Sequence, residues 1–433
     1  HLGTRRGGLA VMDEGFVQRF IHDITNAQFR SKFEPDLPRL VGRFGIGVIS
    51  DTDDQPVMLR SHLGLFAVAT VGAIRNADAI AARMFSERRT HLSEVKGGTV
   101  NQTELVAALI NEEGTFEDGI RHAQETIEGS CSLLILTESG VYAARDRLGR
   151  TPIIAGSKPG AYAVTFETSA FPNLGYRTVR DLGPGEVVRL TPEGIETLVP
   201  PRDKLRICSF LWVYYGYPAS SYEGLNVEMV RYRCGAMLAR RDDVKVDIVA
   251  GIPDSGTGHA IGYAAEARIP YQRPYVKYTP TWPRSFMPQI QSQRDLVAQM
   301  KLVPVPELIN GYRLLFCEDS IVRGTQLQDT IRNLYEVGAK EVHMRPACPP
   351  LVHGCKFLNF SVSRSERDLA ARRAIHEMEG RDDVDLTPYE DAGSAKYAEM
   401  VDRIRTRLRL TTLRYQRLPD LVEAIGLSKD KLC

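Results

Sequence analysis

From about residue 226 onward, short apolar runs alternate with helical stretches, and this alternation constrains the fold more than any other feature of the chain. The apolar runs read VDIVAGIP, RLLFCED and EVHMRPA. Between the last two lies TQLQDTIRNLYEVGA, in which Leu327, Ile331 and Leu334 recur on one helical face. Strands that alternate with helices predict a parallel sheet with crossover helices. Ligands of such sheets bind at the carboxyl ends of the strands, and that edge is therefore the first place to look for a site.

The first half of the chain is strand-rich. Up to about residue 225 it contains short apolar runs separated by turns, and CSLLILTESGVYAARD and GEVVRLTPEGIETLVP both predict hairpins. Helical patterns at 77–87 and 102–112 interrupt the strands, so we expect sheets covered by helices. A chain of 433 residues is too long for one ordinary core. We expect domains at 1–225 and 226–365 and a helical extension at 366–433.

Composition excludes several classes of protein. The net charge is +1 and 25% of residues are charged, which gives no electrostatic reason to expect nucleic acid or an acidic membrane as partner. No apolar run approaches the roughly 18 residues of a membrane-spanning helix. Seven scattered cysteines favour reduced thiols of a cytoplasmic protein, or a metal site, over a disulfide framework. The chain opens at His1 without Met or a signal pattern, and we expect further residues upstream.

The stretch LLFCEDSIVRGTQL, Leu314 to Leu327, combines a strand, two acids and a loop that leads into a helix. Backbone N–H groups of such a loop, with the positive end of the helix, form a phosphate site. Adjacent carboxylates can accept hydrogen bonds from the hydroxyls of a ribose. The pattern therefore predicts a site for a ribose 5-phosphate, built from Glu318, Asp319, Ser320, Ile321, Val322, Arg323, Gly324 and Thr325. The alternative is a solvated strand–loop–helix corner without a ligand.

This stretch resembles the phosphoribosyl pyrophosphate signature of type I phosphoribosyltransferases. The turn Pro253–Gly256 in VAGIPDSGTGHAIGYA resembles the pyrophosphate turn of the amidophosphoribosyltransferase family, and RSFMPQIQSQRDLVAQMKLVP resembles the segment that follows that family's closing loop. The preceding VKYTPTWP departs from the usual loop pattern. The resemblance implies pyrophosphate contacts from Asp254, Ser255 and Gly256, catalytic roles for Glu318, Asp319, Lys277 and Arg284, and Mg²⁺ held by Asp319 and the bound pyrophosphate.

The first half resembles the same family's glutaminase domain, an Ntn-hydrolase-like αββα sandwich with an N-terminal cysteine nucleophile. GRFGIGVISDT, AVATVGAIRNADAI, GGTVNQTELVAALI and GVYAARDRLGRTPIIAG carry the resemblance. Three positions depart from it: Ser50 replaces an arginine for the glutamine carboxylate, Val71 replaces the oxyanion-hole asparagine, and Gln102 replaces an aspartate for the amino group. Losing one oxyanion donor lowers the rate by roughly 10²–10³. We therefore expect the sandwich fold without glutamine hydrolysis.

The cysteines divide into two groups. Cys208 and Cys355 stand where some family members place two ligands of a [4Fe–4S] cluster, and LVEAIGLSKDKLC, which ends in Cys433, resembles the lead-in to the other two. A cluster needs four ligands. The resemblance implies a cluster that uses these three cysteines and a fourth beyond Cys433. The remaining four, Cys131, Cys234, Cys317 and Cys348, are expected in the core.

The resemblance implies a function in the first step of purine synthesis. Phosphoribosyl pyrophosphate and an amine would give 5-phosphoribosylamine and pyrophosphate, with free ammonia or a partner glutaminase as the source of the amine. The family's members imply a homo-oligomer, dimer or tetramer, with purine nucleotide effectors. One alternative is a weak or inactive paralogue that binds phosphoribosyl pyrophosphate or nucleotides in a regulatory or assembly role. Another is transfer to a different nucleophile such as a nucleobase, although salvage enzymes of that kind do not need a fused glutaminase-like domain.

Overall fold

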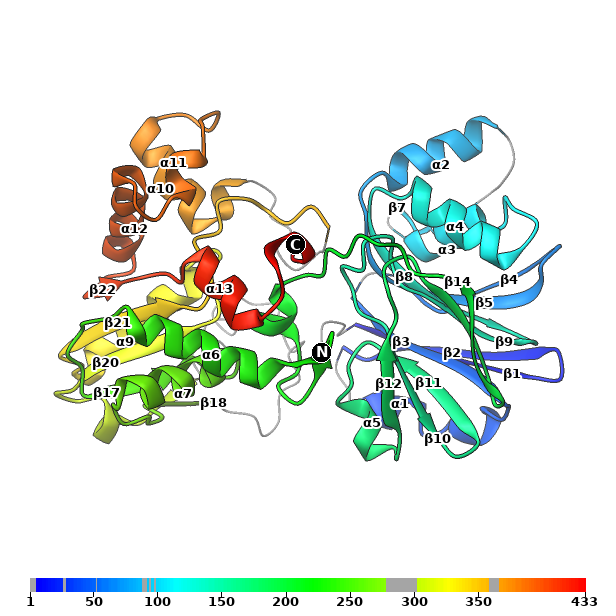
Figure 1. Cartoon of the computed structure of the whole chain (residues 1–433), viewed down its shortest axis with the longest axis horizontal. Helices are drawn as coiled ribbons and strands as arrows, with labels where there is room; N and C mark the ends of the chain where they lie inside the picture. Colours follow the sequence, from blue (N-terminus) through cyan, green and yellow to red (C-terminus); the bar gives the residue numbers. More distant parts are fainter. Residues whose placement is uncertain are drawn as a thin grey trace.

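The computed structural model describes residues 5–25, 29–51, 53–87, 92, 95–96, 99–277, 302–357 and 366–433. These residues form two lobes that lie side by side, with the first half of the chain in one lobe and the second half in the other (Figure 1). The chain passes from one lobe to the other near the π-helical turn η2, Leu211–Tyr215.

The first lobe is a sandwich of antiparallel sheets. A six-stranded sheet has the order β14-β13-β9-β8-β5-β4, and two three-stranded sheets have the orders β2-β1-β3 and β11-β10-β12. Side chains from β1, β3 and β10 pack against the six-stranded sheet in one core that includes Met12, Ile46 and Leu136. The strands are β1 Arg6–Asp13, β2 Phe16–Asp23, β3 Phe44–Ser50, β4 Val57–Ser61, β5 Gly64–Ile74, β8 Gly129–Thr137, β9 Gly140–Ala144, β10 Ile154–Lys158, β11 Ala161–Thr165, β12 Arg177–Asp181, β13 Val187–Thr191 and β14 Gly194–Val199.

Helices cover the outer faces of this sandwich. Helices α2 (Ala77–Ser86), α3 (Gln102–Ile110) and α4 (Phe116–Thr126) lie together over the six-stranded sheet (Figure 1), and a second core that includes Leu105, Ile120 and Ile135 fills the space between. On the other side lie the short helices α1, Phe29–Phe33, and α5, Ala170–Asn173. The predicted αββα sandwich is confirmed. The two predicted hairpins, β8–β9 and β13–β14, and both predicted helices are present.

The second lobe contains the predicted parallel sheet. Its order is β17-β20-β21-β22, and every pair of neighbours is parallel. Val249, Leu315 and Cys317 face helices α6 and α7, whereas Leu314 and Phe316 face the opposite core. Both faces are covered, which explains the continuous apolar runs in the sequence. The elements are α6 Val227–Arg240, β17 Ile248–Gly251, α7 Gly256–Ala267, β18 Tyr275–Lys277, β19 Leu302–Pro304, β20 Arg313–Glu318, α9 Thr325–Val337 and β21 Glu341–Pro346.

The last part of the chain returns to this sheet. It holds helices α10 (Ala370–Glu379), α11 (Thr387–Glu390), α12 (Ala395–Arg407) and α13 (Leu418–Ile425), and also strand β22, Thr412–Leu413, which pairs with β21. The sequence predicts only helices here, because a strand of two residues has no recognisable alternation. Strand β22 forms because β21 offers a free edge with which it can pair. In Figure 1, α10, α11 and α12 stand together above the sheet, and α13 lies against α6.

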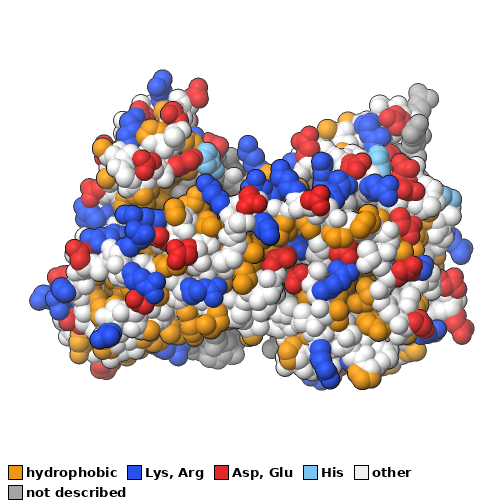
Figure 2. Space-filling model, viewed as in Figure 1, with side chains coloured by type: hydrophobic (Ala, Val, Ile, Leu, Met, Phe, Trp, Pro, Cys, Tyr) orange, Lys and Arg blue, Asp and Glu red, His pale blue; other side chains and the backbone are white. Residues whose placement is uncertain are grey.

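Acidic and basic side chains mix over the face shown in Figure 2, in keeping with a net charge of +1. Within the described ranges, no helix combines the length and apolar character needed to cross a bilayer.

Candidate active site

The predicted phosphate loop and the predicted pyrophosphate turn meet at one edge of the parallel sheet. Strands β17 and β20 are neighbours, so the turn after β17 and the loop after β20 leave the sheet side by side. The Ser255 hydroxyl donates a hydrogen bond of 2.5 Å to Oδ2 of Asp319, and the Ser320 hydroxyl donates one of 2.5 Å to Oδ1 of the same carboxylate. Asp319 therefore joins two sequence segments that were predicted separately.

A glycine allows the turn to approach the acids so closely. A Cβ atom at Gly256 would lie 2.4 Å from the carbonyl oxygen of Cys317, which is far inside van der Waals contact. Helix α7 begins at this glycine and packs against β20 at backbone distance. Any larger residue would push the start of α7, and with it Ser255, away from Asp319.

The two acids differ in their surroundings. Asp319 is 6% exposed and accepts hydrogen bonds on both oxygens, whereas Glu318 is half-buried and its Oε1 accepts the N–H of Asp319 at 3.0 Å. Burial, followed by the neighbouring charge of Asp319, raises the pKa of Glu318 well above its ordinary value. A neutral Glu318 can donate a hydrogen bond to one sugar hydroxyl, while the Asp319 carboxylate can accept a hydrogen bond from another.

The loop after the acids presents free backbone donors. Within the described part of the chain, the N–H groups of Ile321, Val322, Gly324 and Thr325 have no hydrogen-bond acceptor. Gly324 takes a left-handed conformation, with φ of 77°, immediately before α9 begins at Thr325. N–H donors beside a helix N-terminus are the usual arrangement for a bound phosphate.

Only one of the two predicted cationic residues lies in the described structure. Lys277, at the end of β18, forms an ion pair with Asp254 in the pyrophosphate turn. A basic side chain from β18 therefore lies beside the turn that contains Ser255. Arg284 lies outside the described residues, as does most of the segment from 284 to 304.

Two buried basic residues behind the site were missed by the sequence reasoning. Arg231 on α6 donates to the carbonyls of Trp212, Tyr214 and Gly216, and His259 on α7 contacts the carbonyl of Val213 at 3.1 Å. Together they hold the turn η2, where the chain passes between the lobes. Burial lowers the pKa of His259 to about 3, so the imidazole is neutral. The sequence did offer a signal for Arg231, because a charged residue there interrupts the apolar face of a helix.

In the first lobe, two of the three positions that depart from the glutaminase pattern meet at one aspartate. Ser50 ends β3, and its hydroxyl accepts the N–H of Asp53 at 3.2 Å. The Asp53 carboxylate accepts the N–H of Gln102 at 3.1 Å, and the Gln102 side-chain oxygen accepts the N–H of Ile74 at 3.3 Å. The Gln102 amide is thus bonded to the end of β5, and no guanidinium stands at position 50.

The third departure lies on β5 itself. Val71 is 45% exposed, and a valine side chain offers no donor to an oxyanion. Gly72 packs so tightly that a Cβ would lie 1.8 Å from the carbonyl of Ser130. Thr103 and Glu104 belong to the start of α3, where the Asn101 side chain caps both N–H groups.

Comparison with known proteins identifies the family. Residues 41–173 match the glutamine amidotransferase domain family. The amidophosphoribosyltransferase of Synechococcus elongatus is 32% identical over 413 residues, which cover 90% of this chain and 80% of that protein. The chain belongs to the amidophosphoribosyltransferase family.

Other members of this family agree. The Bacillus subtilis amidophosphoribosyltransferase is 33% identical over 328 residues, which cover 75% of this chain and 67% of that protein. The solved structure of the glutamine phosphoribosylpyrophosphate amidotransferase from B. subtilis, complexed with ADP and GMP, superposes with a TM-score of 0.84 at 27% identity and covers 100% of this chain and 90% of that chain. The same family accounts for both lobes.

Of the three cysteines at the predicted cluster positions, Cys208 is buried in one hydrophobic core, and Cys355 packs against that core. Cys433 pairs with the segment around Cys208, because its N–H donates to the carbonyl of Ile207 at 2.8 Å and its carbonyl accepts the Ser209 N–H at 3.4 Å. Burial, and to a lesser extent the thiols of Cys433 and Cys355, raise the pKa of Cys208 to about 12. The other four cysteines are buried, as expected.

These three thiols do not by themselves fit a four-thiolate cluster. Among the residues that the structure describes, no group of three or more side chains has a metal-binding arrangement. No step of the chemistry is therefore assigned to a cluster.

Proposed function

We propose that this family member transfers ammonia to phosphoribosyl pyrophosphate, and that the ammonia does not come from glutamine hydrolysed in its own first lobe. The observation that carries the proposal is the hydrogen bond between Ser255 and Asp319. It places a turn suited to the leaving pyrophosphate beside an acid suited to the ribose, at the carboxyl end of a parallel sheet. The relatives of this chain are named as amidophosphoribosyltransferases, so the alternative that it is an inactive paralogue is less favoured.

The chain's own residues would bind and orient the substrate. The free N–H groups of the loop would hold the 5-phosphate, and Glu318 and Asp319 would hold the ribose hydroxyls. Ser255 and Lys277 would contact the pyrophosphate. The bond from the anomeric carbon to the pyrophosphate oxygen breaks with its electrons going to oxygen, ammonia forms the new C–N bond with its lone pair, and the nitrogen then releases one proton to the departing pyrophosphate or to water. Because the transition state resembles an oxocarbenium ion, the site must also exclude water. We propose that Arg284, outside the described residues, contributes charge to the leaving group.

Mg²⁺ fits this arrangement. It is usually bound by one or two carboxylates together with substrate phosphates and waters, so a cage of protein ligands is not needed. Asp319 would supply the carboxylate oxygen, and the bound pyrophosphate would supply further oxygens. When bound, the ion offsets the charge of the pyrophosphate.

The loss of glutamine hydrolysis rests on Ser50, Val71 and Gln102. The carboxylate of glutamine lacks an arginine at position 50, the oxyanion lacks a donor at 71, and the amide of Gln102 is bonded to the backbone of Ile74. These changes act on three different groups of the substrate. Restoring any one of them would therefore not be enough.

Turnover of phosphoribosyl pyrophosphate with either ammonium or glutamine as donor tests both parts of the proposal. The protein should carry its native N-terminus. Turnover with ammonium alone would support the proposal in full. Turnover with glutamine would refute the interpretation of Ser50, Val71 and Gln102, and binding without turnover from either donor would favour the regulatory alternative.

The iron–sulfur cluster remains a prediction that concerns Cys208, Cys355 and Cys433. Full-length protein purified without oxygen should be brown and absorb broadly near 400 nm, as iron–sulfur proteins do. A colourless sample without iron would remove the cluster from consideration.

A further inference from the structure

Strand β18 carries Lys277 to the pyrophosphate turn, but it is not a strand of the four-stranded parallel sheet. In the described part of the chain β18 pairs with β19, and the two form a separate ribbon in which Tyr275 lies opposite Pro304 and Lys277 opposite Leu302. A two-stranded ribbon is only marginally stable by itself. The position of β18 therefore depends on how its side chains are anchored to the rest of the lobe.

Tyr275 supplies such an anchor. Its side chain is 3% exposed, and the centroid of its ring lies 6.2 Å from that of Phe316 on β20. Its hydroxyl donates a hydrogen bond to Oδ1 of Asn333 at 2.7 Å and lies 3.1 Å from the carbonyl oxygen of Thr330, and both acceptors belong to α9. Burial raises the pKa of Tyr275, so the hydroxyl keeps the proton that it donates. One side chain thus joins β18 to β20 and to α9.

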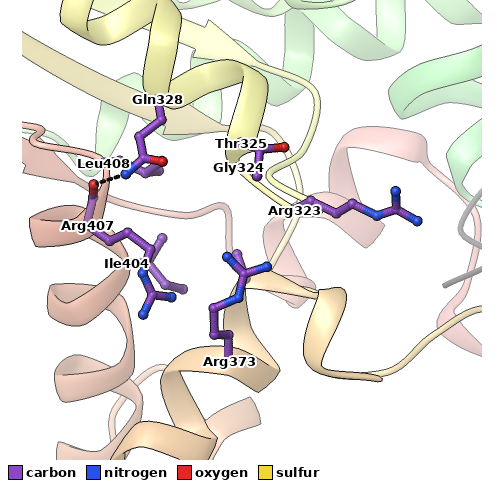
Figure 3. Close-up of a pocket in the computed structure, with 9 residues that line it drawn as sticks. Arg323, Gly324, Thr325, Gln328, Arg373, Ile404, Arg407 and Leu408 are labelled. Carbon is purple, nitrogen blue, oxygen red and sulfur yellow. Dashed lines mark hydrogen bonds between the residues drawn. The ribbon is translucent and has the colours of Figure 1, made fainter. Parts of the chain in front are cut away.

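Helix α9 gives this anchor a fixed support. Ile331 and Leu334 of this helix are fully buried in the core beneath the sheet. In its first turn, the side chain of Gln328 donates a hydrogen bond to the carbonyl of Arg407 on α12 at 2.8 Å (Figure 3). The helix begins at Thr325, where the phosphate loop ends. Tyr275 therefore fastens β18 to an element whose position is set by other contacts.

Lys277 shares a face of the strand with Tyr275. Side chains two positions apart in a strand point to the same face. Val276 between them is 37% exposed, whereas Lys277 ends the strand and forms an ion pair with Asp254 of the pyrophosphate turn. A lysine side chain is a flexible four-carbon stem, so the reach of its ammonium group depends on where the strand holds its Cα atom.

We propose that Tyr275 is a positioning residue that acts through Lys277: by fastening β18 to α9, it holds the lysine ammonium at the place of the leaving pyrophosphate. This inference rests on the proposed function, in which Lys277 contacts the pyrophosphate. Negative charge grows on the pyrophosphate oxygen as its bond to the anomeric carbon breaks, and a cation that is already in place does not have to reorient at that moment. Tyr275 itself is buried and does not contact the substrate.

Tyr275→Phe tests this role, because it removes the hydroxyl and keeps the ring. Tyr335→Phe is the matched control, since Tyr335 lies on α9 and its hydroxyl is 3.2 Å from that of Thr411 rather than near β18. Calorimetry with Mg²⁺ present would measure the binding of pyrophosphate and of ribose 5-phosphate in separate titrations. We expect Tyr275→Phe to weaken pyrophosphate binding about tenfold, the upper end for one neutral hydrogen bond, and to leave ribose 5-phosphate binding within about twofold. Tyr335→Phe should change neither.

A double-mutant cycle with Lys277→Gln separates positioning from a general loss of stability. In the Lys277→Gln background, Tyr275→Phe should weaken pyrophosphate binding by less than about twofold, because the side chain that it positions is gone. An equal loss in both backgrounds would overturn the proposal, and so would an equal loss of ribose 5-phosphate binding or an unchanged affinity for pyrophosphate in Tyr275→Phe. If Tyr275→Phe does not fold, Asn333→Ala removes the acceptor on α9 instead and must show the same dependence on Lys277.

Kinetics would distinguish a failure of this inference from a failure of the proposed function. With ammonium as donor, kcat should fall about tenfold in Tyr275→Phe while the KM for ammonium stays within about twofold. Wild-type turnover with an unchanged kcat in Tyr275→Phe would overturn the role of Tyr275 alone. Pyrophosphate binding that depends on Tyr275 through Lys277, in a protein without turnover, would support the positioning role and refute the proposed transfer.

Discussion

The substitution Asp319→Asn tests the assignment of the ribose site most directly. Asp319 accepts one hydroxyl on each carboxylate oxygen, from Ser255 and from Ser320. A carboxylate has about four lone-pair positions, so about two remain for ribose hydroxyls. In asparagine an NH₂ group replaces one of the two oxygens. Serine hydroxyls can rotate to accept from it, but a sugar hydroxyl loses its charged acceptor.

The expected loss follows from the strength of one such bond. A hydrogen bond to a charged group contributes about 1.5–3 kcal/mol. Since each 1.4 kcal/mol corresponds to a factor of ten, the Kd for phosphoribosyl pyrophosphate should rise roughly ten- to a hundredfold. The assay is calorimetry with Mg²⁺ present and no amine donor, and thermal unfolding would confirm that the variant is folded.

Glu318→Gln is the matched control for this experiment. Burial and the charge of Asp319 raise the pKa of Glu318 and so favour its neutral form, and glutamine replaces that form with another neutral group. We expect its Kd to stay within about threefold of the wild type. An unchanged Kd in Asp319→Asn would refute the ribose assignment. A loss in Glu318→Gln as large as that in Asp319→Asn would refute the division of roles between the two acids.

Three further predictions concern the scaffold. Gly256→Ala should abolish turnover, because the new Cβ would lie 2.4 Å from a carbonyl oxygen of β20. Gly114→Ala, whose Cβ would have no atom within 4 Å, should leave turnover unchanged. Normal turnover in Gly256→Ala would contradict the packing argument. The folded-state pKa of His259, about 3, lies below the ordinary 6.5, so its contribution to stability is complete above pH 6.5 and is lost as the pH falls from there toward 3. Urea unfolding of the wild type should give a free energy of unfolding at pH 5.5 that is about 1.4 kcal/mol lower than the value on the plateau above pH 6.5, and His259→Gln should lack this decrease. An equal decrease in both proteins would exclude His259 as its source. Arg75→Ala should separate the thermal unfolding transitions of the two lobes, because Arg75 of the first lobe donates hydrogen bonds to the carbonyls of residues 355 and 356 in the second half of the chain. Arg147→Ala, at an exposed position, is the control. A single, unchanged transition in Arg75→Ala would argue against this role.

Local patterns in the sequence were enough to predict the parallel sheet and the two hairpins of the first lobe. The alternation of apolar runs with helical stretches specified a parallel sheet, because a crossover helix is the usual way to join parallel neighbours. The hairpin β8–β9 followed from a short turn between two apolar runs, and its register needs no distant partner. The strand–loop–helix corner at 313–337 could be predicted for the same reason, since the strand, the loop glycine and the helix are consecutive in the chain.

Contacts between distant residues depend on the tertiary structure. Ser255 and Asp319 are 64 positions apart, and they meet only because β17 lies next to β20, an order that no local pattern encodes. Strand β22 is too short to have a pattern and exists because β21 offers a free edge. The raised pKa of Glu318 likewise reflects desolvation by the folded chain around it.

The sequence by itself determined the family, the parallel sheet and the residue types at the proposed sugar-phosphate site, because each is encoded in consecutive residues. Only the tertiary structure decided which of those residues touch. It brought Cys433 to Cys208, fastened Gln102 to the end of β5, and joined Tyr275 to α9. The physical reason is that such contacts depend on strand order and helix packing, which arise from the burial of the whole apolar surface rather than from any single segment.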